Sequence, residues 1–152
     1  MARAPEVGDL APDFTLPSTQ GELTLSKLLE RGAVLLVFYP GDDTAVCTKQ
    51  LCDYRDNLAV FGGLGVQVVA LNPQSLESHQ KFARKHDFPV PVASDAGGEV
   101  CKRYGARGLL GMTKRALVLV GKDGRVKWQR VDFPIFHQTT EDVRKAIAGL
   151  PG

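Results

Sequence analysis

Three cysteines are the side chains with the most chemistry to offer in this chain of 152 residues. Four residues separate Cys47 from Cys52, whereas Cys101 lies far along the chain. A cysteine thiolate is both a nucleophile and a metal ligand, so a close pair indicates either redox chemistry or a metal site. An odd number of cysteines in a chain of this size argues against a framework of structural disulfides, and it favours a reducing compartment.

The segments on either side of Cys47 predict an activated thiol. Residues 33–39 are continuously apolar, which is typical of a buried strand. Residues 48–61 carry apolar side chains at helical spacing, and the pair Gly62-Gly63 ends that pattern. Cys47 therefore falls where a strand passes into a helix, and there the helix dipole and unpaired backbone N–H groups favour the thiolate.

Acidity alone gives this thiol only a modest advantage. An ordinary cysteine is about 3% thiolate at pH 7, so complete ionisation raises its reactivity by roughly thirtyfold at most. Any further acceleration must come from hydroxyl, guanidinium and backbone N–H donors held around the sulfur. Thr44, three residues before Cys47, offers such a hydroxyl, and Pro40 would stiffen the loop between strand and helix.

The same spacing resembles the active-site segment of the peroxiredoxins, Pro-x-x-x-Thr-x-x-Cys. Pro40, Thr44 and Cys47 match each of its fixed positions. The Thr-Lys-Gln that follows Cys47, and a second cysteine five residues on, are similar to the bacterioferritin-comigratory or Q-type subfamily. This resemblance implies a thiol peroxidase with a thioredoxin-like fold and no cofactor.

The resemblance also implies a role for each site residue. Cys47 would attack hydrogen peroxide or an alkyl hydroperoxide and become a sulfenic acid, Cys52 would condense with it, and thioredoxin or a similar dithiol would reduce the disulfide. Arg115, just before an apolar strand at 116–120, matches the second arginine of the family. Ala45-Val46 replaces the Pro-Gly that commonly precedes the reactive cysteine, and the stretch 105–115 is shorter than usual. A monomer or weak dimer is implied.

The spacing of Cys47 and Cys52 sets a mechanical condition on a disulfide between them. Five residues along an ideal helix give a rise of ~7.5 Å and a turn of ~140°, which puts the Cα atoms roughly 8.6 Å apart. A disulfide needs Cα atoms within about 7 Å. If both cysteines lie in the helix that starts at Cys47, its first turns must unwind after oxidation.

The order of the remaining elements predicts an α/β protein with a thioredoxin-like fold, in which helices flank both faces of a mixed central sheet. Ser75 is expected to cap a helix that runs to about His86, and Gly98 to start a shorter one that ends at Tyr104. Strands are expected at 66–71, 116–120 and 125–131, the last two as a hairpin, and a final helix after the capping box of Thr139 and Asp142.

We expect a single domain over residues 1–152, with additions to the basic fold. The additions are assigned to the N-terminal segments 13–16 and 24–29 and to the mid-chain segment 89–104. No repeat or long linker interrupts the sequence.

Composition excludes several partners. The net charge of +2 arises from 19 basic and 17 acidic residues without a basic block, so we expect no nucleic acid partner. The longest apolar run is far shorter than the ~20 residues of a membrane span, so we expect no membrane partner. Residues 1–11 contain no apolar signal core, and a cytoplasmic location is expected.

Three alternatives compete with the peroxidase hypothesis. A thioredoxin-like disulfide oxidoreductase normally has Cys-x-x-Cys, which is absent here. A non-enzymatic peroxide sensor or holdase could use the same unwinding of the helix. A zinc site lacks a second pair of ligands, since His79 and His86 are too widely spaced and, with His137, are expected at the surface. Cys101 is expected to be a packed thiol, with the role of resolving cysteine as its alternative.

Overall fold

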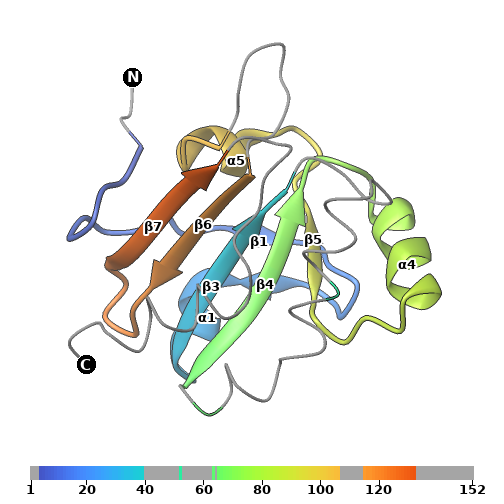
Figure 1. Cartoon of the computed structure of the whole chain (residues 1–152), viewed down its shortest axis with the longest axis horizontal. Helices are drawn as coiled ribbons and strands as arrows, with labels where there is room; N and C mark the ends of the chain where they lie inside the picture. The colour runs from blue at the N-terminus through green and yellow to red at the C-terminus, as the bar shows by residue number, and fades with distance from the viewer. Residues whose placement is uncertain (1–3, 40–51, 53–62, 64, 107–114, 133–152) are drawn as a thin grey trace.

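Residues 4–39, 52, 63, 65–106 and 115–132 are described by the computed structural model. Five strands form its central sheet in the order β5-β4-β3-β6-β7 (Figure 1). Three of them, β3 (Ala33–Phe38), β4 (Val66–Asn72) and β5 (Val92–Ser94), are parallel. β6 (Arg115–Val120) runs antiparallel to β3, and β7 (Val126–Asp132) runs antiparallel to β6. The mixed sheet confirms the expected fold class.

The inner strands are buried on both faces, which explains their continuous apolar runs. In β3, every residue after Ala33 is buried. Leu35 and Val37 contribute to one hydrophobic core, whereas Leu36 and Phe38 contribute to a second core on the opposite face. Each face of the sheet therefore needs a covering layer.

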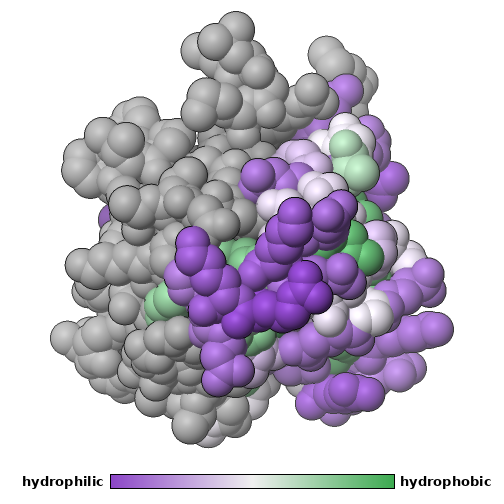
Figure 2. All heavy atoms as spheres, turned by 90° about the vertical axis from the view of Figure 1, so that its right-hand side faces the viewer, coloured by the Kyte–Doolittle hydropathy of each residue, from purple (hydrophilic) through white to green (hydrophobic). Residues whose placement is uncertain are grey.

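Helices provide that layer on both sides. α4 (Leu76–Lys85) packs Phe82 into the first core. α1 (Leu25–Leu28) and α5 (Glu99–Arg103) pack Leu25 and Val100 into the second. α4 begins as predicted, since the Ser75 hydroxyl accepts a hydrogen bond from the Ser78 N–H at 3.1 Å. Figure 2 shows a mainly hydrophilic surface on the side of the molecule that carries α4.

The segment 89–104, predicted to be an addition, contains a strand of the central sheet. β5 pairs with the last three residues of β4, from Ala70 to Asn72. Three residues are too few to show a strand period, so only the pairing with β4 identifies this strand. The N-terminal segments form a small sheet of their own, in which β1 (Thr15–Leu16) pairs antiparallel with β2 (Leu23–Thr24).

The β6–β7 hairpin forms as predicted, with β7 at the edge of the sheet. Its turn closes at Gly124, whose φ of +83° is one that side chains other than glycine rarely adopt. The helices predicted at 48–61 and after Thr139 lie outside the described residues, except that Cys52 is helical. None of the helices within the described ranges is long and apolar enough to span a membrane.

Candidate functional site

The candidate site lies at the edge of the sheet where the parallel strands end. β3, β4 and β5 end there at Phe38, Asn72 and Ser94, because parallel strands share one carboxyl edge. β6 begins at the same edge, since Ala116 pairs with Phe38 in antiparallel register. Arg115, the first residue of β6, is therefore brought to the point where the chain leaves β3. Open α/β sheets bind ligands at this edge.

The structure describes two of the predicted site residues. Arg115 opens β6, and Cys52 is a half-buried cysteine in helical conformation. Pro40, Thr44 and Cys47 lie outside the described residues. The described part of the chain ends at Tyr39, one residue before the predicted motif begins.

Tyr39 is held firmly at this edge. Its side chain is 0% exposed, and its backbone N–H donates to the Leu71 carbonyl at 3.4 Å. The Tyr39 Oη lies 3.5 Å from Nδ1 of His79, and the two ring centroids are 6.4 Å apart. A buried hydroxyl needs a hydrogen-bonding partner, and the His79 ring is within reach to be one.

The prediction of a surface position is wrong for His79, whereas His86 is half-buried and His137 lies outside the described residues. His79 is 0% exposed because it faces the sheet one turn before Phe82, which is also wholly buried. His86 is half-buried, with its ring centroid 4.6 Å from that of Phe82. The helical spacing of the inner face of α4 already included position 79, so the periodicity was the signal that could have located this histidine.

A network of hydrogen bonds joins the ends of β4 and β5 through the buried Asn72, Ser94 and Asp95 and the exposed Gln74. The Asn72 side chain accepts from the Gln74 N–H at 2.9 Å and donates to the Gln74 side-chain oxygen at 3.2 Å. The Ser94 hydroxyl donates to the Gln74 carbonyl at 2.7 Å, and the Asp95 N–H donates to the Asn72 carbonyl at 2.9 Å. Satisfied polar groups of this kind make the sheet edge rigid.

Asp95 also fixes the position of Cys101. Its carboxylate is 2% exposed and accepts hydrogen bonds from the backbone N–H groups of Val100 and Cys101, at 3.2 and 2.8 Å. Acidic side chains are favoured at this end of a helix. Cys101 is 1% exposed within the second core, which confirms the prediction of a packed thiol.

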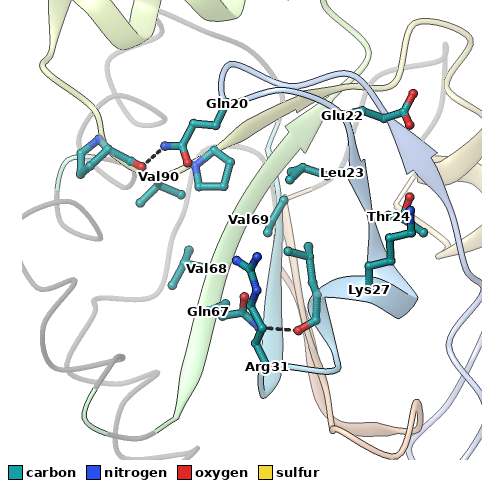
Figure 3. Close-up of a pocket in the computed structure, with 13 residues that line it drawn as sticks. Gln20, Glu22, Leu23, Thr24, Lys27, Arg31, Gln67, Val68, Val69 and Val90 are labelled. Atoms are coloured by element: carbon teal, nitrogen blue, oxygen red, sulfur yellow. Dashed lines mark hydrogen bonds between the residues drawn. The ribbon is translucent and has the colours of Figure 1, made fainter.

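A separate cavity of about 530 Å³ lies beside the first half of β4. Figure 3 shows the Arg31 side chain next to Val68 and Val69, with Lys27 on the other side of the cavity. The Gln67 side chain closes its base by donating to the Leu28 carbonyl at 2.8 Å. Because this cavity lies beside the residues that begin β4, it is distinct from the carboxyl edge at which the cysteine motif starts.

Metal-binding side chains are not gathered in the described part of the chain. Within residues 4–39, 52, 63, 65–106 and 115–132, no three or more His, Cys, Asp or Glu side chains are grouped so that they could hold a metal ion.

The mixed sheet and its flanking helices define a thioredoxin-like fold. Residues 7–129 match the model of the AhpC/TSA family. The chain is 40% identical over 99 residues to the chloroplastic peroxiredoxin Q of Sedum lineare, a match that covers 64% of this chain and 53% of that protein. It is 36% identical over 122 residues to the chloroplastic peroxiredoxin Q of Arabidopsis thaliana, covering 79% of this chain and 56% of that one.

A solved structure agrees with these relatives. The crystal structure of peroxidoxin BcpB from Mycobacterium tuberculosis superposes with a TM-score of 0.82 at 32% identity, and the match covers 95% of both chains. The chain spans little more than half the length of the two plant relatives. The chain belongs to the AhpC/TSA family, among the peroxiredoxins of the bacterioferritin-comigratory or Q type.

Proposed function

We propose that this protein is a thiol peroxidase that reduces hydrogen peroxide and organic hydroperoxides through Cys47. One observation carries the proposal. The Pro-x-x-x-Thr-x-x-Cys motif starts directly after Tyr39, at the carboxyl edge of β3, and the strand register brings Arg115 to the same edge. The proposal thereby assigns a nucleophile, a hydroxyl and a guanidinium to one end of the sheet. The hydroxyl and the guanidinium are donors of the kind that stabilises charge as an O–O bond breaks.

The first half of the proposed cycle oxidises Cys47. Its thiolate attacks one peroxide oxygen, so that an S–O bond forms as the O–O bond breaks. The departing oxygen takes up a proton and leaves as water or an alcohol, and Cys47 becomes a sulfenic acid. Thr44 and Arg115 are the proposed donors to the peroxide oxygens. Pro40 is proposed to stiffen the loop that holds them.

The second half restores the thiol. The Cys52 thiolate attacks the sulfenic sulfur, water leaves, and a Cys47–Cys52 disulfide forms. Two electrons from thioredoxin or a similar dithiol then reduce it. Helical residues five apart on an ideal helix have Cα atoms roughly 8.6 Å apart, too far for a disulfide, so the helix must partly unwind in each cycle. The helical, half-buried state of Cys52 supports a starting form in which this unwinding has not occurred.

The setting of this activity is part of the proposal. We assign one domain to residues 1–152, a cytoplasmic location, and a monomer or weak dimer. The single sheet supports the assignment of one domain, because β3 contributes side chains to both hydrophobic cores, one on each face.

Peroxide turnover tests the proposal directly. Reduced protein is mixed with hydrogen peroxide, thioredoxin, thioredoxin reductase and NADPH, and NADPH oxidation is followed. We expect Cys47→Ser to abolish turnover, and Cys52→Ser to form a sulfenic acid that dimedone traps but to turn over no further. Cys101→Ser is the matched control and should turn over normally, since Cys101 is packed in the core.

Three results would contradict parts of this scheme. Turnover that survives Cys47→Ser would remove the proposed nucleophile. Loss of the disulfide in Cys101→Ser would show that Cys101, and not Cys52, is the resolving cysteine. A wild-type protein that is oxidised by peroxide yet never turns over with any dithiol would instead be a sensor or holdase.

A further inference from the structure

We propose that His79 is a positioning residue for the peroxide-reactive loop, and that it acts through Tyr39. The proposal rests on the function proposed above, and it adds a residue outside the motif. His79 lies on α4, whereas Tyr39 is the residue that directly precedes Pro40. The two side chains meet in the interior, with Tyr39 Oη 3.5 Å from His79 Nδ1.

Burial makes this contact matter. Both side chains are 0% exposed, so neither the phenol nor the imidazole can exchange its partner for bulk water. A polar group that is deprived of its partner in such a place is left with the cost of desolvation, and it shifts toward water or toward another partner. His79 therefore presents a polar atom to the Tyr39 hydroxyl at a place that bulk water does not reach.

Tyr39 directly precedes the loop that starts at Pro40, so its position restricts how the chain enters that loop. Proline at position 40 fixes its own φ and restricts the backbone of the residue before it. Tyr39 donates its N–H to the Leu71 carbonyl, and its hydroxyl lies 3.5 Å from His79 Nδ1. His79 is thus proposed to act on the entry to the motif through Tyr39.

His79 is itself held by the structure of α4. Its backbone N–H donates to the Ser75 carbonyl at 3.1 Å, in the first turn of the helix. One turn further on, Phe82 is 0% exposed and packs edge-on against Phe88, with ring centroids 5.6 Å apart. A helix anchored at both of these points presents the imidazole to Tyr39 from a fixed direction.

Replacing His79 by residues with differently placed polar atoms tests this role. His79→Asn keeps a polar atom near the position of Nδ1, His79→Gln moves it outward to the position of Nε2, and His79→Leu removes it. The measurement is the second-order rate constant for oxidation of the reduced protein by hydrogen peroxide. A misplacement of about 1 Å can cost a rate about a hundredfold, so we expect a fall of about tenfold or more in His79→Leu and His79→Gln.

Rescue by asparagine separates positioning from general stability. We expect His79→Asn to stay within about twofold of the wild-type rate, as a retained contact requires. Lys81→Ala is the control, because it changes an exposed side chain of the same helix, and its rate should also be unchanged. Equal slowing in His79→Asn and His79→Leu, or slowing in Lys81→Ala as large as that in His79→Leu, would overturn the proposal.

A double-mutant cycle with Tyr39→Phe gives a second, independent test. If His79 acts through the Tyr39 hydroxyl, Tyr39→Phe alone slows oxidation, and adding His79→Leu slows it no further. Slowing by His79→Leu that is as large in the Tyr39→Phe background as in the wild type would overturn the inference. A wild-type rate no faster than that of free cysteine would instead contradict the proposed peroxidase, so the two failures are distinguishable.

Discussion

At the scale of single residues, Cys47 owes its proposed reactivity mainly to its neighbours. Full ionisation of a thiol adds roughly thirtyfold at most at pH 7, far less than a peroxidase requires. Donors that stabilise the breaking O–O bond must supply the remainder. The motif assigns one of these donors to Thr44, and the family resemblance assigns the other to Arg115. The register of β3 and β6 supports the second assignment.

Thr44→Val tests the contribution of the hydroxyl at nearly constant shape. Loss of one fixed donor to a developing negative charge typically costs a rate about a hundredfold or more, and we expect a fall of this order in the rate of oxidation by hydrogen peroxide. Stopped-flow oxidation of the reduced variant measures it. Thr48→Val, just beyond Cys47, is the control and should react at close to the wild-type rate. A Thr44→Val variant as fast as the wild type would remove Thr44 from the site.

At the scale of elements, the sequence predicted best where burial imposes a long pattern. β3 and β4 could be recognised because both of their faces are buried and the apolar run is continuous. β5 could not, since its three residues owe their strand conformation to pairing with the end of β4. His79 was assigned to the surface because the sequence pairs it with no carboxylate or cysteine, although its place on the inner face of α4 requires burial.

For the candidate site, the residues could be named from the sequence, but their contacts in space could not. The position of Arg115 at the carboxyl edge follows from strand register, which a single sequence does not contain, although the residue itself could be named from the family resemblance. Tyr39 was visible as the residue before Pro40, but its anchoring by His79 depends on how α4 packs across the sheet. Contacts between distant segments are the part that local patterns cannot supply.

Capping of α4 gives a stability prediction for one element. Ser75→Ala removes the hydroxyl that accepts from the Ser78 N–H, and loss of such a cap typically lowers the free energy of unfolding by about 1 kcal/mol. Urea denaturation measures the change. Lys81→Ala is the matched control, because it removes only an exposed ion pair with Glu77, which is worth about 0.3 to 0.5 kcal/mol. Equal losses in the two variants would show that the cap contributes no more than an exposed ion pair.

Unwinding of the helix that carries Cys52 is the second prediction at this scale. Formation of the Cys47–Cys52 disulfide should unwind roughly five residues of helix, because the two cysteines are that many positions apart along the chain. Far-ultraviolet circular dichroism of the reduced and peroxide-oxidised protein measures the loss. Cys52→Ser, oxidised only to the sulfenic acid, should keep its helical signal. An unchanged spectrum of the disulfide form would mean that the cysteines do not start on one regular helix.

At the scale of the whole molecule, Tyr104 ties the N-terminal segment to the second core. Its hydroxyl donates to the Pro12 carbonyl at 2.6 Å, and its ring packs against Phe38 with centroids 5.4 Å apart. Burial, reinforced by the nearby Asp13 carboxylate, raises the pKa of Tyr104 well above its ordinary value. The folded protein therefore holds this proton more tightly than the unfolded chain does.

Linkage converts that difference into a dependence of stability on pH. The contribution of Tyr104 is fully present below the pKa of an unfolded tyrosine, about 10, and is lost progressively as the pH rises above it. We expect the free energy of unfolding to fall between about pH 10 and pH 11.5, and to fall less steeply in Tyr104→Phe, which has no phenol to ionise. Urea denaturation at each pH measures both curves. Parallel curves for the two proteins would contradict the raised pKa.

The rate at which the reduced protein reacts with hydrogen peroxide tests the central claim most directly. Stopped-flow mixing at pH 7, with wild type and Cys47→Ser compared, gives the second-order rate constant of the thiol. The proposed site predicts a rate at least about a thousandfold above that of free cysteine, since ionisation contributes only roughly thirtyfold and the fixed donors must add the rest. A wild-type rate no faster than that of free cysteine would contradict the assignment of Cys47 as a peroxidase nucleophile.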